Sequence, residues 1–293
     1  MYDINALYEA ESVQNAIELL TEHEDAVIIA GGSDVLIKIR EGKLAGCTLV
    51  SIQKLDELRG VSLEEDKTLR IRPLTSFSHI TKDPLIQKYI PVLGEAVDMV
   101  GGPQIRNIGT IGGNTCNGVT SADSGSTLVA FEAIMEITGP NGVRRLPINE
   151  FYLRPGKVAL EHNELLTSIL IKPESYENCF GHYIKYAMRN AMDIATLGCS
   201  VNVKLSADKK TVERARVGYG VAGPVPMRAL NAEATANGKL ANAQTAAAVG
   251  RAALEDVNPR TSWRASKELR LQLVEELAVR AFTKAVMLAG GVI

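Results

Sequence analysis

Hydrophobic positions near the start of the chain follow a helical pattern, then a strand pattern, then a helical pattern again. Apolar residues repeat at helical spacing over 13–20, behind Ser12, whose hydroxyl can cap a helix. The apolar run AVIIA, residues 26–30, predicts a buried strand that stops at two glycines. A second helical repeat starts at Ser33 or Asp34. The opening segment is therefore predicted to be helix, strand, glycine turn and helix.

Alternating and helical patterns continue through the next hundred residues. TLVSI, 48–52, and TLRIRPLT, 68–75, alternate like strands. Residues 83–100 have a helical pattern, which Pro91 is expected to kink or divide. Residues 134–148 are predicted to form a hairpin around Gly-Pro-Asn-Gly.

The pattern changes near residue 180. GHYIKYAMR, 181–189, is predicted to be a strand, and two long strands are expected on either side of a polar turn at 207–210. Three alanine-rich helices are then predicted, over 229–237, 243–256 and 266–288.

Strands and helices are thus mixed without a regular βαβ alternation, which indicates an α+β fold. The polar stretch KPESYEN, 172–178, is the best candidate for a domain boundary. We therefore expect two domains, over residues 1–175 and 176–293.

Composition narrows the class of protein. Hydrophobic residues make up 46% of the 293 residues and charged residues 23%, which is typical of a packed soluble protein. A net charge of −2 argues against a nucleic-acid partner. The N-terminal segment lacks the basic and apolar regions of a signal peptide, and no run approaches the ~20 apolar residues of a membrane span. We expect a cytoplasmic protein with no membrane partner.

The four cysteines are scattered along the chain, at positions 47, 116, 179 and 199. An iron–sulfur cluster or a structural zinc usually takes its ligands from close pairs of cysteines, and this chain has no such pair. We therefore predict no metal site and ordinary reduced thiols.

One glycine motif is rejected on its context. GYGVAG, 218–223, matches the dinucleotide-binding G-x-G-x-x-G pattern. That fingerprint requires a helix that opens from the glycines and an acidic residue about 20 positions later. Pro224 and Pro226 prevent the helix, and no Asp or Glu lies near residue 242. We interpret the motif as the glycine-rich end of a strand.

AGGSD, residues 30–34, is better placed because it joins a predicted strand to a predicted helix. Backbone N–H groups in such a turn can bind an anion such as a diphosphate, and glycines let the ligand approach. Asp34 would repel phosphate, so it is expected to cap the helix or to accept from a ligand hydroxyl. A plain strand-to-helix turn stays open as the alternative.

TIGGN, residues 110–114, repeats the same theme with a hydroxyl, two glycines and a polar side chain. Neither glycine pair is followed by the Lys-Ser/Thr of a nucleoside triphosphate site. Together the two stretches predict one long diphosphate ligand that is held twice through backbone N–H groups, without phosphoryl transfer.

The two motifs in this order and spacing carry a resemblance to a known family. IIAGGSDVL, 28–36, followed by GPQIRNIGTIGGNTCNGVTSAD, 102–123, resembles the flavoprotein subunits of molybdenum hydroxylases, the family of xanthine dehydrogenase and the carbon monoxide dehydrogenase medium subunit. Two later stretches, 181–199 and 257–273, are similar to the separate FAD subunit of bacterial xanthine dehydrogenases. The resemblance covers nearly the whole chain.

The resemblance implies a two-lobed FAD-binding domain of the vanillyl-alcohol-oxidase (PCMH) type, followed by a smaller C-terminal domain. It also implies FAD and a set of cofactor-binding residues, with no catalytic side chain. We expect the FAD to be non-covalent, because the two glycine stretches contain no evident His or Cys to link a flavin. Those residues are Val27, Ile28, Ile29, Ala30, Gly31, Gly32, Ser33, Asp34, Thr110, Ile111, Gly112, Gly113, Asn114, Asp123, Leu166 and Lys185. From composition alone, Leu166 would be ordinary core and Lys185 a solvated surface charge.

Partners follow from the same resemblance. A large molybdopterin-binding subunit and a small [2Fe–2S] subunit would supply electrons to FAD, with NAD as the acceptor in a xanthine dehydrogenase-like complex. One departure weakens the expectation of NAD: Pro155 stands where animal relatives carry an aromatic residue near the flavin, and Tyr152 lies three residues earlier. Met192 and Asp193 fall in a loop that covers the flavin in relatives.

Three alternatives remain at this stage. The chain could serve a related hydroxylase that acts on carbon monoxide, nicotinate, a purine or an aromatic substrate. It could be a stand-alone flavin reductase, although no substrate-protonating side chain is evident. It could also be an assembly subunit without FAD, which the intact glycine pairs argue against.

Overall fold

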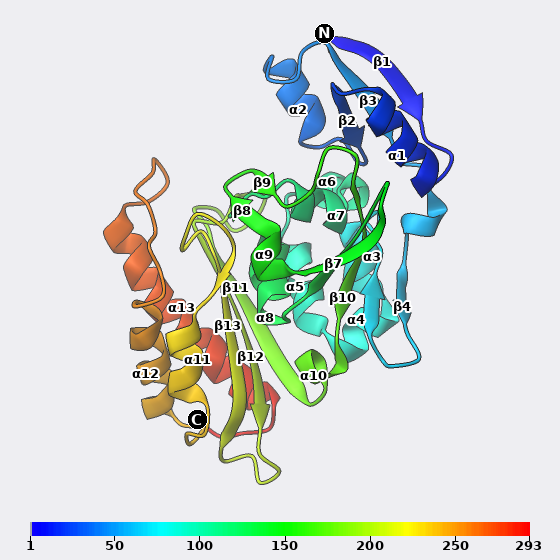
Figure 1. Cartoon of the computed structure of the whole chain (residues 1–293). Coiled ribbons are helices and arrows are strands. Elements are labelled where there is room, and N and C mark those ends of the chain that lie inside the picture. The colour runs from blue at the N-terminus through cyan, green and yellow to red at the C-terminus, as the bar shows by residue number, and fades with distance from the viewer. Residues whose placement is uncertain (1) are drawn as a thin grey trace.

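A computed structural model describes residues 2–293 and contains two lobes followed by a third, C-terminal unit (Figure 1). The first lobe is a three-stranded parallel sheet in the order β1-β3-β2, with α1 and α2 packed beside it. Its elements are β1 (Ile4–Glu9), α1 (Val13–Glu22), β2 (Ala26–Ile29), α2 (Val35–Arg40) and β3 (Cys47–Ser51). The Ser12 hydroxyl caps α1 by accepting from the Asn15 N–H. The predicted helix, strand, turn and helix are confirmed, but β1 was missed.

The second lobe contains an antiparallel sheet in the order β4-β5-β10-β6-β7. The strands are β4 (Val61–Leu63), β5 (Leu69–Ile71), β6 (Ile134–Gly139), β7 (Gly142–Pro147) and β10 (Leu165–Ile171). The β6–β7 hairpin confirms the prediction for 134–148, whereas β5 is shorter than the predicted strand over 68–75. A short helix η1 (Asp56–Leu58) leads into this lobe, and β8 (Tyr152–Arg154) pairs with β9 (Lys157–Val158).

Seven short helices complete the second lobe. They are α3 (Phe77–Lys82), α4 (Pro84–Tyr89), α5 (Pro91–Asp98), α6 (Pro103–Ile108), α7 (Ile111–Cys116), α8 (Asp123–Ala130) and α9 (Ile148–Phe151). Pro91 begins α5 and so divides the predicted helix over 83–100 into two. The three helices between residues 103 and 130 were missed. TIGGN, expected as a turn, is instead the capped start of α7.

The C-terminal unit is a four-stranded antiparallel sheet in the order β11-β12-β13-β14, joined to the second lobe through α10 (Pro173–Tyr176). Helices α11 and α13 pack against this sheet, α12 packs against both helices, and α5 and α8 of the second lobe contact β11, β12 and β13 (Figure 1). The elements are β11 (Cys179–Tyr186), β12 (Leu197–Leu205), β13 (Val212–Gly220), β14 (Met227–Arg228), α11 (Leu230–Ala236), α12 (Ala243–Ala253) and α13 (Lys267–Leu288). The two long strands and three helices are confirmed, as is the α+β class.

Two glycines of GYGVAG lie where the end of β13 meets the second lobe. A Cβ atom at Gly218 would lie 2.1 Å from the Ser126 carbonyl oxygen of α8, and one at Gly220 would lie 3.0 Å from the Thr120 carbonyl oxygen. Glycine at the end of β13 therefore lets α8 approach the sheet backbone closely. The interpretation as a glycine-rich strand end is confirmed.

No helix within residues 2–293 is both long and apolar enough to cross a membrane.

Candidate functional site

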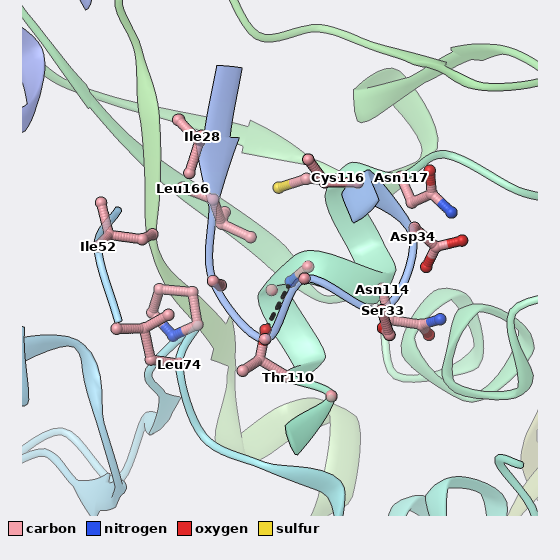
Figure 2. A pocket seen from close by; sticks show the side chains of 18 of the residues that line it. Ile28, Ser33, Asp34, Ile52, Leu74, Thr110, Asn114, Cys116, Asn117 and Leu166 are labelled. Carbon is pink, nitrogen blue, oxygen red and sulfur yellow. Dashed lines mark hydrogen bonds between the residues drawn. The ribbon is translucent and has the colours of Figure 1, made fainter. Parts of the chain in front are cut away.

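A cavity of about 290 Å³ lies where the β2–α2 turn of the first lobe meets α7 and β10 of the second (Figure 2). Most of the residues predicted to bind the cofactor line it. They are Ile28, Ala30, Gly31, Gly32, Ser33, Asp34, Thr110, Gly112, Gly113, Asn114 and Leu166. The fold thus brings together two stretches that are far apart in the sequence, as the prediction of one ligand held twice requires.

The cavity has an apolar and a polar side. Figure 2 shows Ile28, Ile52, Leu74 and Leu166 together on one side. The opposite side carries the polar residues Ser33, Asp34, Asn114 and Asn117. Few precisely placed polar groups in a largely apolar cleft are typical of a cofactor site. This division suits a ligand with an apolar ring system at one end and charged groups at the other.

The glycines of the first turn are required by the protein itself. A Cβ at Gly31 would lie 1.9 Å from the Ile108 carbonyl oxygen, so the turn packs directly on the backbone that precedes α7. Gly32 has a φ of +73°, which disfavours any residue with a side chain. The plain-turn alternative therefore explains both glycines without a ligand.

The donors of the first turn nevertheless point to a ligand. The N–H groups of Gly31, Gly32, Ser33 and Asp34 donate no hydrogen bond within residues 2–293. Asp34 precedes α2 but makes no capping hydrogen bond through its side chain, so its carboxylate is free to accept from a ligand hydroxyl. Unpaired backbone donors beside a cavity are costly to leave without an acceptor, and an anion would satisfy several at once.

The backbone N–H groups of the second stretch, residues 110–114, differ from the prediction. The N–H groups of Ile111 and Gly112 donate to the carbonyl oxygens of Thr75 and Pro73, at 3.0 and 2.9 Å. The Gly113 N–H donates to the Thr110 hydroxyl oxygen at 3.1 Å, the bond dashed in Figure 2. The prediction of free backbone N–H groups is therefore wrong for residues 111–114, whose N–H groups already donate within the protein.

Gly112 and Gly113 have separate roles. Gly112 is buried, and a Cβ there would lie 2.3 Å from Cβ of Pro73, so its glycine is a packing requirement. Gly113 is exposed at the cavity, and a Cβ there would meet only the Thr110 hydroxyl, at 2.9 Å. Neither has a positive φ, so the backbone conformation does not require glycine at either position. Gly113 is thus the glycine of this pair that no backbone or core contact accounts for.

Asn114 supplies the polar side chain of the second stretch. Its Oδ1 accepts from the Ser124 hydroxyl at 2.7 Å, at the start of α8. This bond orients the amide and leaves its nitrogen, which donates to no other group in the described chain, available to a ligand.

Five predicted cofactor residues do not line the cavity. Val27 and Ile29 lie on the other face of β2, where they pack beside α2, as the alternation along a strand requires. Ile111 is fully buried in the core of the second lobe. Asp123 and Lys185 form an ion pair at the junction between α8 and β11. Their contact with the cofactor stays a prediction.

The Asp123–Lys185 pair is buried, with side-chain exposures of 6% and 7% and an N–O distance of 2.9 Å. Asp123 also accepts from the Tyr183 hydroxyl at 2.6 Å, and Lys185 donates to the Met99 carbonyl oxygen at 2.9 Å. Burial raises the pKa of Asp123, while the Lys185 ammonium opposes the rise. The expectation of a solvated Lys185 is wrong.

Sequence reasoning missed several residues of the cavity wall. Pro73 and Leu74 come from the segment before α3, and Phe77 is the first residue of that helix. Lys38 and Asn117 face each other across the polar side. The turn-forming Pro73 and the apolar spacing of this segment gave no sign of a ligand. Pro155 is exposed and Tyr152 is buried in the core, so neither lines the cavity. Met192 is exposed on a loop near Gly102.

Cys116 also lines the cavity. Burial raises the pKa of its thiol to about 12, so the thiol is neutral at physiological pH and a poor nucleophile. All four cysteines are free. The described residues contain no group of three or more His, Cys, Asp or Glu side chains placed to hold a metal ion.

Comparison with known proteins assigns the family. Residues 2–173 match the family model for the FAD binding domain in molybdopterin dehydrogenase, and residues 182–285 match that for the CO dehydrogenase flavoprotein C-terminal domain. The chain is 43% identical to the xanthine dehydrogenase FAD-binding subunit of Escherichia coli O157:H7, over 99% of both chains. It is 30% identical to the nicotinate dehydrogenase FAD-subunit of Eubacterium barkeri, over 77% of each.

Solved structures agree with this assignment. Carbon monoxide dehydrogenase from Hydrogenophaga pseudoflava, in a form that lacks the Mo-pyranopterin moiety of its cofactor, superposes with a TM-score of 0.92 at 28% identity, over 99% of both chains. Quinoline 2-oxidoreductase from Pseudomonas putida 86 gives 0.90 at 25% identity, over 97% of both. The chain therefore belongs to the family of FAD-binding flavoprotein subunits of molybdopterin dehydrogenases, and the resemblance inferred from its motifs is confirmed.

Proposed function

We propose that this chain is the FAD subunit of a xanthine dehydrogenase-like molybdenum hydroxylase and passes electrons from the [2Fe–2S] clusters of a small partner subunit to NAD in the cytoplasm. The observation that carries the proposal is the cavity between the lobes. Its unpaired N–H groups and the exposed Gly113 come from the two motifs that define the resemblance. The 43% identity over nearly the full length to a xanthine dehydrogenase FAD-binding subunit supports the substrate class.

The residues of the cavity fit FAD. In the proposal the N–H groups of residues 31–34 bind the diphosphate, Gly113 leaves room for it, and Asn114 donates from the second lobe. Ile28, Ile52 and Leu166 pack against apolar parts of the cofactor and exclude water. When bound, FAD can take single electrons from a cluster and give two to NAD, so the chain needs to supply only binding, orientation and control of potential. No side chain is assigned as an acid or base.

Expressed together with the genes beside its own, the tagged chain is expected to co-purify with a molybdopterin-binding large subunit and a small [2Fe–2S] subunit. Xanthine should reduce the complex and NAD should reoxidise it, which absorbance of the flavin and of NADH will report. Reduction by nicotinate or carbon monoxide but not by xanthine would reject the substrate class. A fully active single chain without partners would reject the subunit role.

A further inference from the structure

The polar side of the cavity contains one positively charged side chain, Lys38, that no carboxylate pairs with in the described residues. Lys38 lies on α2, one helical turn after Asp34, and its ammonium donates to Oδ1 of Asn117 at 2.8 Å. Among the described residues that line the cavity, Lys38 is the only lysine or arginine. Its contact in the described chain is with the neutral Asn117 amide and not with a carboxylate, although Asp34, the only carboxylate among the described residues of the cavity wall, lies on the same side. A partly buried ammonium that faces only a neutral amide is available to an anion.

The Lys38–Asn117 bond also joins the two lobes. Lys38 comes from the first lobe and Asn117 caps the C-terminal end of α7 in the second, 79 residues further along the chain. Figure 2 shows Asn117 beside Asp34, on the side of the cavity that carries Ser33 and Asn114. The ammonium therefore lies on the same side as the unpaired N–H groups of residues 31–34.

Without Lys38, no cationic side chain among the described residues of the cavity wall would balance the charge of a bound diphosphate. A diphosphate diester carries about two negative charges at neutral pH, and backbone N–H groups solvate these charges but do not neutralise them. Asp34 adds a further negative charge on the same side. An ion held in a partly dry site requires a charged partner, and an ammonium has three donors, of which Lys38 uses one on Asn117.

We propose that Lys38 is the cation that pairs with the diphosphate of FAD and that, through Asn117, it ties the two lobes together across the ligand. This inference rests on the proposed function, because it presupposes that FAD occupies the cavity. It makes Lys38 a determinant of affinity for phosphate-bearing flavins over flavins without phosphate.

The test compares FAD with riboflavin, which has the same ring and no phosphate. Flavin-free protein is titrated with each, by quenching of flavin fluorescence, at several salt concentrations. Lys38→Gln is expected to weaken FAD binding about 10- to 100-fold, as for the loss of one charge-assisted hydrogen bond. Riboflavin affinity should not change, and the salt dependence of FAD binding should become shallower. Lys38→Arg should retain most of the affinity.

Two further variants separate charge from structure. Lys43→Gln removes an exposed lysine of the first lobe that pairs with Glu41 and lies outside the cavity, so it should leave both affinities unchanged. Asn117→Asp places a carboxylate against Lys38 and should weaken FAD binding but not riboflavin binding. Wild-type affinity of Lys38→Gln for FAD would overturn the inference, as would an equal loss for both flavins. Failure of the wild-type chain to bind FAD would instead reject the proposed function.

Discussion

Gly113→Val is expected to abolish FAD binding, with an affinity loss of at least ~100-fold, while the chain stays folded. The side chain would enter the cavity, since a Cβ at this position meets no backbone or core atom and only the Thr110 hydroxyl, at 2.9 Å. That contact also disturbs the cap of α7, which should cost about 1 kcal/mol of stability. Flavin absorbance of the purified variant and its thermal unfolding measure the two effects separately.

Gly112→Val is the matched control, one residue earlier in the same helix. Its side chain would meet Pro73 at 2.3 Å inside the protein, so it should destabilise the fold rather than selectively block the ligand. Thr110→Val removes the capping hydroxyl without adding bulk, so its thermal unfolding measures the cost of the lost cap separately. Normal flavin content in Gly113→Val would show that FAD does not lie against α7.

Asp123→Ala is expected to lower the free energy of unfolding by about 3–5 kcal/mol, because it leaves the Lys185 ammonium buried without its carboxylate. The Tyr183 hydroxyl loses its acceptor as well. Chemical denaturation of the flavin-free chain measures the loss. The double variant Asp123→Ala with Lys185→Met should recover part of it, since both charges are then absent.

The exposed pair of Lys204 and Glu213 provides the comparison within the sheet that carries Lys185. Its N–O distance is 3.3 Å and its side chains are 38% and 45% exposed, so Glu213→Ala should cost no more than ~1 kcal/mol. If Asp123→Ala also lost no more than ~1 kcal/mol, and Lys185→Met recovered none of that loss, the pair would not be a structural link between α8 and β11.

The sequence predicted those parts of the molecule whose local signals agree with the final contacts. Ser12 capped its helix, Pro91 divided a helix, and the hairpin and long strands followed their alternation. β1 was missed because it lies at the edge of its sheet and is mostly exposed, so it lacks a buried face that alternates. Helices α6, α7 and α8 were missed because their glycines and prolines suggested turns, whereas in the structure close packing requires Gly112 and Pro103 starts a helix.

The two motifs that form the site could be predicted from the sequence, but the role of each residue within the site could not. Spacing placed residues 30–34 and 110–114 together, but it could not show that three of their four glycines serve the protein: Gly31 packs on the Ile108 carbonyl, Gly32 has positive φ and Gly112 packs on Pro73. Nor could it show that residues 31–34 keep their N–H groups free while residues 111–114 donate theirs within the protein. The contact between Lys38 and Asn117 could not be predicted, because it depends on how the two lobes pack together.

In the proposed function, the cavity between the lobes holds FAD without a covalent bond. The most direct measurement is the flavin content of the purified chain, determined before and after acid precipitation, for the wild type and for Gly113→Val. We predict about one FAD per wild-type chain, released in full to the supernatant, and none in the variant. Yellow flavin that stays in the pellet would contradict non-covalent binding, and equal flavin content in both proteins would contradict FAD binding in this cavity.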